Sequence, residues 1–284
     1  MKTLTQRIWS QVEAVRSAHP LVHCITNYVT VNDCANALLA AGAAPVMAHA
    51  PEESAEITGG CQALVLNMGA TEYYPSMYLS GEEALKKRIP MVLDPVGVGG
   101  STYRRKEAFR MIDRLHPAVV RGNLSEIRAL ITDSRTARGV DNAEKERADS
   151  RFPEETACAV AAFAREKGTI VIASGTVDLL TDGNVTYALD NGSRFMSMIT
   201  GAGCMSTALL GAFMGTERSF DAAFSCCCVM AIASELAEEA ALSHDGGPGT
   251  FRCRLMDSLY LIREEDIVRR LRARLLSAYG GTVH

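Results

Sequence analysis

The sequence predicts an α/β fold with three layers, in which a mostly parallel central sheet is covered by helices on both faces. Through residue 173, short continuous apolar runs alternate with longer segments of helical periodicity, the pattern of strands that are buried on both faces. The chain has 284 residues, 48% of them hydrophobic, with no internal repeat and no low-complexity linker. We therefore expect a single domain that spans residues 1–284 and contains a substantial core.

Six short apolar runs predict the parallel strands. They are Leu21–Ile25, Ala44–Met47, Ala63–Asn67, Met91–Asp94, Ala118–Arg121 and Thr169–Ala173. A helix is expected over residues 3–18, where apolar residues recur on one face. Between the runs, the expected helices are Val29–Ala41, Glu53–Thr58, Tyr74–Arg88, Tyr103–Leu115, Ser125–Ile131 and Glu154–Lys167.

The pattern changes after Ala173. Two further strands, Val177–Thr181 and Thr186–Leu189, flank the turn residues Asp182-Gly183-Asn184 and predict a hairpin. From Gly203 onward we expect helices, which include the apolar segment Ala222–Ala241 and a final pair, Arg252–Ile262 and Glu264–Tyr279.

Composition excludes several classes of function. The net charge of −4 and the scattered charges offer no basic surface, so no nucleic-acid partner is expected. No stretch approaches the roughly 20 apolar residues that span a bilayer, so no membrane association is expected either. Nine cysteines, with Cys226–Cys228 consecutive, match neither a disulfide framework nor a paired zinc motif. Free thiols in a reducing cytoplasm are the simplest interpretation.

A glycine-rich turn before a helix is the most informative motif. The chain has no G-x-x-x-x-G-K-[ST] motif, and Gly97–Gly100 makes only a partial dinucleotide loop. In Thr200-Gly201-Ala202-Gly203-Cys204, two glycines precede a helical segment. Backbone N–H groups of Gly201, Ala202 and Gly203 would converge there and form an anion hole for a transferring phosphoryl group. A plain tight turn at a helix start is the alternative.

Cys204 favours the functional interpretation. A thiol in the first turn of a helix tends to have a lowered pKa, because the helix dipole favours the thiolate. Such a group could accept the proton of an attacking hydroxyl, so we predict that Cys204 is catalytic. A buried structural cysteine is the alternative.

Acidic residues follow two of the predicted strands. Asp94 closes one strand, and Glu126 follows the next, three residues after Asn123. Ligands gather at the carboxyl ends of strands in such sheets, and Mg²⁺ prefers a few oxygen ligands with retained water. We therefore predict that Asp94 and Glu126 hold Mg²⁺. A capping box formed by Asn123 and Glu126 explains the same spacing equally well.

Two residues at strand ends are suited to phosphate. Arg121 stands beside Gly122, where its guanidinium could clamp a phosphate group. Ser174 follows the strand Thr169–Ala173 and offers a hydroxyl beside Gly175. Several such features at successive strand ends indicate a kinase that transfers a phosphoryl group from ATP to a primary alcohol.

Taken together, these segments resemble the hydroxyethylthiazole kinase family of the ribokinase-like superfamily, over essentially the whole chain. The matching segments are Pro20–Asn27, Gly42–Met47, Leu93–Gly97, Arg121–Asn123 with Glu126, Thr200–Cys204 and Gly247–Phe251. The resemblance implies a three-layer ribokinase-like fold. It also implies Mg²⁺-dependent phosphorylation of 4-methyl-5-(2-hydroxyethyl)thiazole by ATP, in thiamine biosynthesis or salvage.

The resemblance also implies roles for residues. Met47, Gly201 and Asn27 are expected to contact the thiazole, and Arg121 and Ser174 to contact ATP. The family resemblance further implies a homotrimer with active sites at the subunit interfaces. In most ribokinase-like enzymes an aspartate stands at the position of Cys204, and the cysteine of this chain is similar to the thiazole kinases themselves. Neither Cys226–Cys228 nor the polar segment Thr132–Pro153 has a functional interpretation.

Three alternatives share parts of this pattern. A hydroxymethylpyrimidine kinase belongs to the same pathway, and an ATP- or ADP-dependent hydrate dehydratase shares the fold and nucleotide site. The dehydratase chemistry usually rests on the aspartate that Cys204 replaces. A nucleotide-binding module without catalysis is disfavoured, because Cys204, Asp94 and Glu126 are all present.

Overall fold

The structure, a computed structural model, describes residues 2–132 and 154–278. The polar segment Thr132–Pro153 therefore lies outside the described residues, apart from Thr132 itself. Within these described residues, nine strands form one sheet with the order β2-β1-β3-β4-β5-β6-β7-β8-β9. The strands β1 to β6 pair in parallel, and β7, β8 and β9 pair antiparallel. Their bounds are β1 Leu21–Ile25, β2 Ala44–Val46, β3 Ala63–Asn67, β4 Met91–Asp94, β5 Val119–Asn123, β6 Ile170–Ser174, β7 Asp178–Thr181, β8 Val185–Leu189 and β9 Ala273–Ala278.

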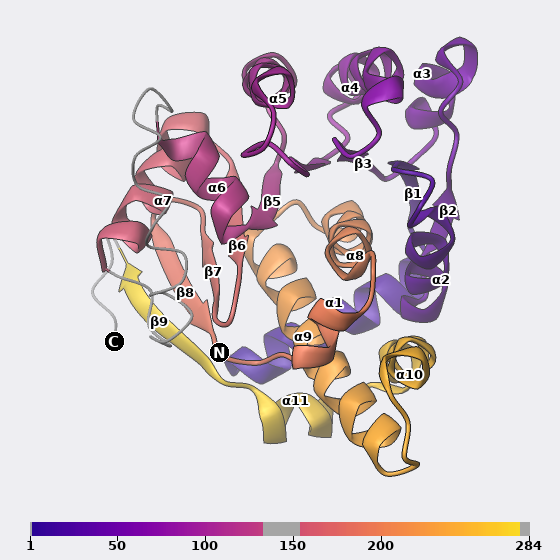
Figure 1. The fold of residues 1–284 in the computed structure, drawn as a ribbon, viewed down its shortest axis with the longest axis vertical. Helices are drawn as coiled ribbons and strands as arrows, with labels where there is room; N and C mark the ends of the chain where they lie inside the picture. The colour runs from indigo at the N-terminus through magenta and orange to yellow at the C-terminus, as the bar shows by residue number, and fades with distance from the viewer. Residues whose placement is uncertain (1, 133–153, 279–284) are drawn as a thin grey trace.

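Helices cover both faces of this sheet (Figure 1). The α-helices of the described residues are α1 Leu4–Ala18, α2 Val31–Ala41, α3 Pro51–Gly59, α4 Tyr74–Lys87, α5 Thr102–Leu115, α6 Leu124–Ile131, α7 Glu154–Lys167, α8 Ala202–Thr216, α9 Phe220–Leu242, α10 Pro248–Leu261 and α11 Glu264–Arg270, with short 3₁₀ turns η1 Thr71–Tyr73 and η4 Arg194–Met198. The three-layer fold predicted from the sequence is thereby confirmed.

Two hydrophobic cores lie on opposite faces of the sheet, because successive side chains of a strand point to opposite sides. In β4, Val92 belongs to the core formed with α1, α2, α8, α9 and α10, whereas Leu93 belongs to the core formed with α4, α5, α6 and α7. In β5, Val119 and Val120 divide in the same way. Figure 1 shows α4 and α5 on one side of the sheet and α8, α9 and α1 on the other.

The first six strands start and end within two residues of their predicted positions, and the hairpin of β7 and β8 is confirmed. Its turn is closed by Asp182, whose Oδ1 accepts hydrogen bonds from the N–H groups of Asn184 and Val185, both at 2.8 Å. The turn residues therefore predicted this hairpin correctly.

The predicted final helix, Glu264–Tyr279, is wrong. Helix α11 ends at Arg270, and Ala273–Ala278 form β9, antiparallel to β8. Without β9, the N–H and C=O groups on the outer edge of β8 would be unpaired, so the tertiary structure overrides the local helical tendency. The new strand is anchored at its start by an ion pair between Arg274 and Asp190 at 2.8 Å.

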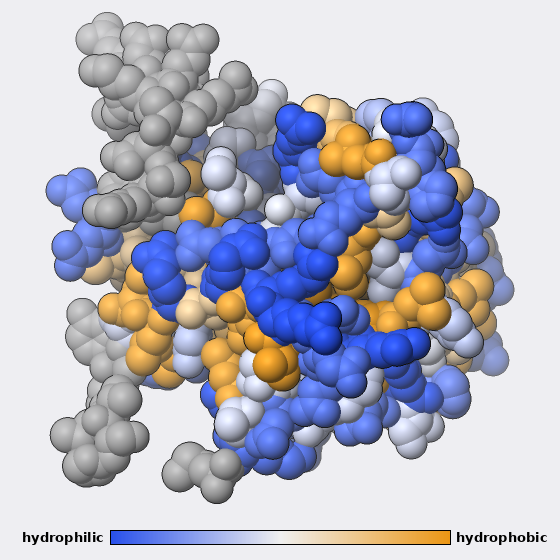
Figure 2. Space-filling model, turned by 90° about the horizontal axis from the view of Figure 1, so that it is seen from below, coloured by the Kyte–Doolittle hydropathy of each residue, from blue (hydrophilic) through white to orange (hydrophobic). Residues whose placement is uncertain are grey.

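Helix α9 contradicts the expectation that no segment is apolar enough to cross a membrane. Of the described helices of at least 18 residues, it is the one whose length and composition would allow a span. In the structure 72% of its most apolar window is buried inside the protein, as for a central core helix. On the molecular surface that Figure 2 shows, polar residues separate the apolar ones.

We predict that Phe251→Ala lowers the free energy of unfolding by about 3–5 kcal/mol, the usual cost of emptying a large aromatic site. Phe251 is fully buried and packs edge-on against Phe195, with ring centroids 5.4 Å apart. Denaturant unfolding followed by circular dichroism measures the change. The matched control is Tyr260→Ala on the same helix, since Tyr260 is 68% exposed and should shift stability by less than about 0.5 kcal/mol. Equal losses in the two variants would contradict the packing argument.

Candidate active site

Four polar residues lie at or within two residues of the carboxyl ends of neighbouring parallel strands, on the face covered by α8. They are Asn67, Asp94, Arg121 and Ser174, from β3, β4, β5 and β6. Each stands two positions after a residue of the α8-side core, so strand alternation turns it toward α8. In the sheet register Asn67 pairs with Asp94. The sequence pattern thus brings these side chains together at one edge, where open α/β sheets bind their ligands.

The N-terminal turn of α8 faces this edge. Gly201 caps the helix with a φ of 81°, a conformation that side chains disfavour, and a Cβ there would lie 2.7 Å from Cγ2 of Thr30. The first hydrogen bond of the helix runs from the N–H of Met205 to the carbonyl of Gly201 at 2.8 Å. Because the N–H groups before it have no helical acceptor, those of Ala202, Gly203 and Cys204 are available to an anion.

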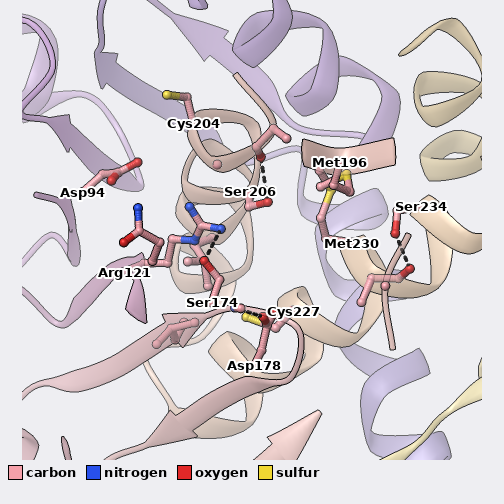
Figure 3. A pocket seen from close by; sticks show the side chains of 18 of the residues that line it. Asp94, Arg121, Ser174, Asp178, Met196, Cys204, Ser206, Cys227, Met230 and Ser234 are labelled. Atoms are coloured by element: carbon pink, nitrogen blue, oxygen red, sulfur yellow. Dashed lines mark hydrogen bonds between the residues drawn. The ribbon is translucent and has the colours of Figure 1, made fainter. Parts of the chain in front are cut away.

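Arg121 adds a full positive charge to this turn. Its guanidinium lies against Gly203, where a Cβ would come within 2.7 Å of Nη1. Nη2 donates a hydrogen bond to Oγ of Ser174 at 3.1 Å, which aims the guanidinium at the pocket (Figure 3). Backbone N–H groups and a guanidinium therefore converge, as phosphate recognition requires.

Asp94 is a buried carboxylate, 2% exposed. Its Oδ2 accepts hydrogen bonds from Nδ2 of Asn67 at 3.1 Å and from Oγ1 of Thr207 at 2.8 Å. Burial raises the pKa of Asp94 to about 6, opposed mainly by the positive charge of Arg121. The group is therefore largely ionised at neutral pH and carries the cost of a buried charge.

The sequence left two roles open for Glu126, a ligand of Mg²⁺ and a partner of Asn123 in a capping box. The structure confirms the capping box. Its Oε2 accepts from the N–H of Asn123 at 2.9 Å, and Oε1 accepts from the N–H of Gly97 at 2.9 Å. The side chain also lines the pocket. Glu126 therefore holds the loop after β4 against the start of α6, and its role toward Mg²⁺ stays a prediction.

The two carboxylates at this site suit an Mg²⁺ ion that the protein coordinates only in part. Within residues 2–132 and 154–278, no group of three or more His, Cys, Asp or Glu side chains could hold a metal ion. Asp94 and Glu126 offer two carboxylates at the rim of the anion site. Mg²⁺ usually takes one or two carboxylates and completes its shell with water and nucleotide phosphates, so the residues present fit that ion.

The expectation of a lowered pKa for Cys204 is wrong. Burial raises the pKa of this thiol, and the charge of Asp94 raises it further. Hydrogen bonds with Thr30, Asn27 and Asn67 act in the opposite direction, with Nδ2 of Asn27 at 3.6 Å and Nδ2 of Asn67 at 3.2 Å from Sγ. The helix terminus is present as predicted, but desolvation and the nearby carboxylate outweigh it.

A pocket of about 580 Å³ opens at the start of α8. Asp94 and Cys204 lie on one side of this helix turn, and Met196, Met230 and Ser234 lie on the other (Figure 3). The predicted residues that line the pocket are Asp94, Arg121, Glu126, Ser174, Gly201, Ala202, Gly203 and Cys204. The structure thus assembles most of the predicted site from five separate segments.

Met47 and Asn27 do not line this pocket. Met47 follows β2, is half-buried and packs against the α8-side core. Asn27 follows β1 and reaches Cys204 through its amide. Their predicted contacts with a second substrate stay predictions.

Several residues that line the pocket or hold its lining residues were missed from the sequence. Asn67 and Thr207 hold Asp94, and Cys226 and Cys227, which had no functional interpretation, line the wall contributed by α9. Burial raises the pKa of another missed residue, Asp178, to about 6. Asn67 ends a correctly predicted strand, so the strand-end argument used for Asp94 would have found it. The α9 residues carry no local signal, because only helix packing brings them to the pocket.

Comparison with known proteins gives a consistent result. A sequence model described as the Hydroxyethylthiazole kinase family matches residues 12–265. A protein of Methanobrevibacter smithii named hydroxyethylthiazole kinase is 38% identical, over 96% of this chain and 98% of the relative. One of the same name from Nitratidesulfovibrio vulgaris is 42% identical, over 94% and 97%.

Solved structures agree. A structure of hydroxyethylthiazole kinase protein from Pyrococcus horikoshii OT3 superposes with a TM-score of 0.82 at 36% identity, covering 95% of this chain and 99% of that one. A ribokinase-like superfamily protein from Enterococcus faecalis V583 superposes with a TM-score of 0.57 at 10% identity, covering 86% and 88%. The latter supports the fold alone.

We expect Gly203→Ala to weaken ATP binding by about 10-fold or more without destabilising the protein. The added methyl would meet Nη1 of Arg121 at 2.7 Å and displace the guanidinium. Alanine within a helix is otherwise favourable by about 0.4–1 kcal/mol, so folding should not suffer. Isothermal calorimetry measures the affinity and thermal unfolding the stability. Normal ATP affinity in the folded variant would show that Arg121 does not contact the phosphates.

Asp94→Asn should stabilise the ligand-free protein at pH 8 while abolishing most activity. The native pKa of about 6 lies above the ordinary value of 3.8, so the folded state binds this proton more tightly than the unfolded state. The resulting penalty is present above pH 6 and disappears as the pH falls toward 4. Removing it is worth about 1–3 kcal/mol at pH 8, and the gain should shrink between pH 6 and pH 4.

Urea unfolding in the presence of a chelator measures this difference across pH. The control is Asp257→Asn on the exposed side of α10, which should change stability by less than about 0.5 kcal/mol. A variant that is less stable than the wild type at pH 8 would refute the interpretation of Asp94 as a costly buried charge.

Proposed function

The chain belongs to the hydroxyethylthiazole kinase family, and we propose that it transfers the γ-phosphoryl group of ATP to the hydroxyl of 4-methyl-5-(2-hydroxyethyl)thiazole. The product would enter thiamine biosynthesis or salvage. The observation that carries this proposal within the structure is the N-terminal turn of α8, residues Gly201–Cys204, against which the guanidinium of Arg121 lies at the pocket wall. Family membership supplies the identity of the alcohol.

The nucleotide phosphates fit the electropositive part of the pocket. The free N–H groups of Ala202, Gly203 and Cys204 would surround the transferring group, where charge spreads over three oxygens. Arg121 and Ser174 would bind the phosphates next to it, since they share a hydrogen bond at 3.1 Å. The more distant wall, with Met196, Met230 and Ala231, leaves room for the rest of the nucleotide.

Asp94 and Glu126 would hold Mg²⁺ in part through water. The ion, when bound, neutralises charge on the phosphates during transfer. The contribution of this chain is to keep Asp94 ionised at neutral pH, through Arg121 and two hydrogen-bond donors, despite burial. Glu126 keeps the loop after β4 in place through the N–H of Gly97.

Cys204 would face the acceptor hydroxyl. Its Sγ lies beside Asn27, on the opposite side of the helix turn from Met196 and Met230. The raised pKa keeps the thiol mostly protonated before ligands bind, and the charge of Asp94 is the second cause of that shift. Neutralisation of Asp94 would remove this cause. Because the transition state of phosphoryl transfer is loose, proton removal is needed only late.

The family alternatives can be separated by substrate. Release of ADP should be measured with the thiazole alcohol and with the hydroxymethylpyrimidine alcohol, each against a reaction without enzyme. The proposal requires a clear preference for the thiazole alcohol. Preference for the pyrimidine would assign the chain to the other kinase, and ADP release without any alcohol acceptor would indicate an ATPase.

We further propose assembly as a homotrimer, which the family resemblance implies. Helix α2 and the two residues Tyr28 and Val29 shortly before it expose large apolar side chains, with Tyr28 77%, Val29 55% and Leu39 57% exposed. Asn27, beside Cys204, directly precedes this segment, so a neighbouring subunit could complete the acceptor side of the site. Light scattering that returned a fully active monomer would contradict this assembly.

A cytoplasmic location is also proposed. All nine cysteines are free thiols in the structure, and Cys158 and Cys253 are exposed. Exposed free thiols suit a reducing compartment.

Cys204→Ala should lower kcat by about 10²–10⁴-fold and leave the KM for ATP close to normal, because general base catalysis is lost while the phosphate site remains. Cys204→Asp should retain substantial activity, since a carboxylate can accept the same proton. Steady-state kinetics with a circular dichroism check of folding measures both. If Cys204→Ala turns over as fast as the wild type, the thiol only packs against the pocket wall and the proton leaves by another route.

A further inference from the structure

Every donor and acceptor position of the Asn67 side-chain amide takes part in a hydrogen bond. The residue ends β3 and is 1% exposed. Its Oδ1 accepts from the N–H of Gly69 at 2.9 Å and from Nδ2 of Asn27 at 3.3 Å. Its Nδ2 donates to Oδ2 of Asp94 at 3.1 Å and to Sγ of Cys204 at 3.2 Å. A buried amide has two acceptor positions and two donors, so this set is complete.

The orientation of the amide is determined by its neighbours. The backbone N–H of Gly69 can only donate, so it requires Oδ1 on its side. The NH₂ group must then face Asp94 and Cys204. A Cβ at Gly69 would lie 2.8 Å from Oδ1, so the backbone approaches as closely as only glycine allows. The loop at Gly69 therefore fixes Oδ1 of the amide, and this fixes the direction in which Nδ2 points toward Asp94 and Cys204.

No other described side chain is shown bonding both groups. Thr207 also donates to Oδ2 of Asp94, at 2.8 Å, but it makes no bond to the thiol, and its hydroxyl has a second acceptor in the carbonyl of Gly203 at 3.0 Å. Asn27 contacts the thiol but not the carboxylate. Asn67 is thus the direct connection between the proposed metal side and the proposed acceptor side of the reaction.

We propose that Asn67 is a positioning residue whose single amide group holds the Cys204 thiol in register with the Asp94 carboxylate. The proposal rests on the function proposed above, in which these two groups act on opposite partners of the transfer. One N–H orients each group, so the sulfur is directed to one place before substrate binds. Loss of the amide removes the shorter of the two amide bonds to the sulfur, which keeps Asn27 and Thr30, and leaves Asp94 with the side-chain donor Thr207.

The first test measures the thiol without relying on kinase activity. Full-length wild-type protein, Asn67→Ala and Thr207→Val are treated with iodoacetamide in the absence of metal and nucleotide. Labelling of each cysteine is followed by peptide mass spectrometry. Exposed Cys158 and Cys253 serve as internal standards in every sample. Thr207→Val is the matched control, because it removes the other bond to Asp94 and leaves the bond to Cys204.

In Asn67→Ala we expect alkylation of Cys204 to slow by about 5-fold or more relative to the standards, because a donated hydrogen bond favours the reactive thiolate. Thr207→Val should stay within about 2-fold of the wild type. An unchanged or faster rate in Asn67→Ala, or equal slowing in both variants, would overturn the proposal. If Asn67→Ala does not fold by circular dichroism, the same measurement on Asn67→Ser decides.

The second test uses kinetics. Removing a residue that orients a reacting group costs about 10–100-fold, so kcat of Asn67→Ala should fall by that factor with the KM for ATP within about 3-fold. In the Cys204→Ala background the same change should have a much smaller effect, since the two residues act together. Full additivity would show that Asn67 supports only the end of β3 and would refute the proposal.

The two tests also separate this inference from the proposed function. Slow alkylation together with a normal kcat would confirm that Asn67 holds the thiol and would refute the catalytic role of Cys204. Normal alkylation together with a low kcat would refute the role of Asn67 toward Cys204 and leave the kinase assignment intact.

Discussion

The meeting of the α8 N-terminus with the carboxyl edge of the parallel strands is the contact on which the site depends. Helix α8 can approach this closely because Gly201 adopts a positive φ against Thr30, and because Gly203 leaves space for the guanidinium of Arg121. Along the rest of its length α8 is almost entirely buried in the core beside α9. The same packing that stabilises the fold therefore fixes the position of the free N–H groups that an anion needs.

The pKa values of the ionisable groups at this edge depend on burial and on a small number of neighbouring side chains. Burial raises the pKa of Asp94, while Arg121 and the hydroxyl of Thr207 act against that shift. The charge of Asp94 in turn raises the pKa of Cys204, and Asn67 donates to both groups. The site is therefore a coupled network, in which changing one group alters its partners. Such networks cost stability in the ligand-free protein and provide a prearranged environment for charge that develops during reaction.

Much of the site could be predicted from local sequence, and the reason is geometric. Strands of a parallel sheet end at one edge, so Asp94, Arg121 and Ser174 were expected to meet once their strands had been assigned. The turn Gly201–Cys204 was found because two glycines before a helix have a distinctive local requirement. The pKa of Cys204 was predicted in the wrong direction, since a helix terminus is visible in the sequence whereas the burial and the carboxylate that outweigh it are not.

The sequence by itself determined the fold class, the edge of the sheet that carries the chemistry and the residue types gathered there, because strand periodicity and turn chemistry are properties of short segments. Only the tertiary structure decided that the end of the chain pairs with β8 as β9 rather than continuing as a helix, since an open sheet edge must be satisfied from elsewhere. It also decided that Cys226 and Cys227 line the pocket and that Asn67 links Asp94 to Cys204. These relations join residues that are far apart in the chain, and packing and hydrogen bonding select them only after the layers have assembled.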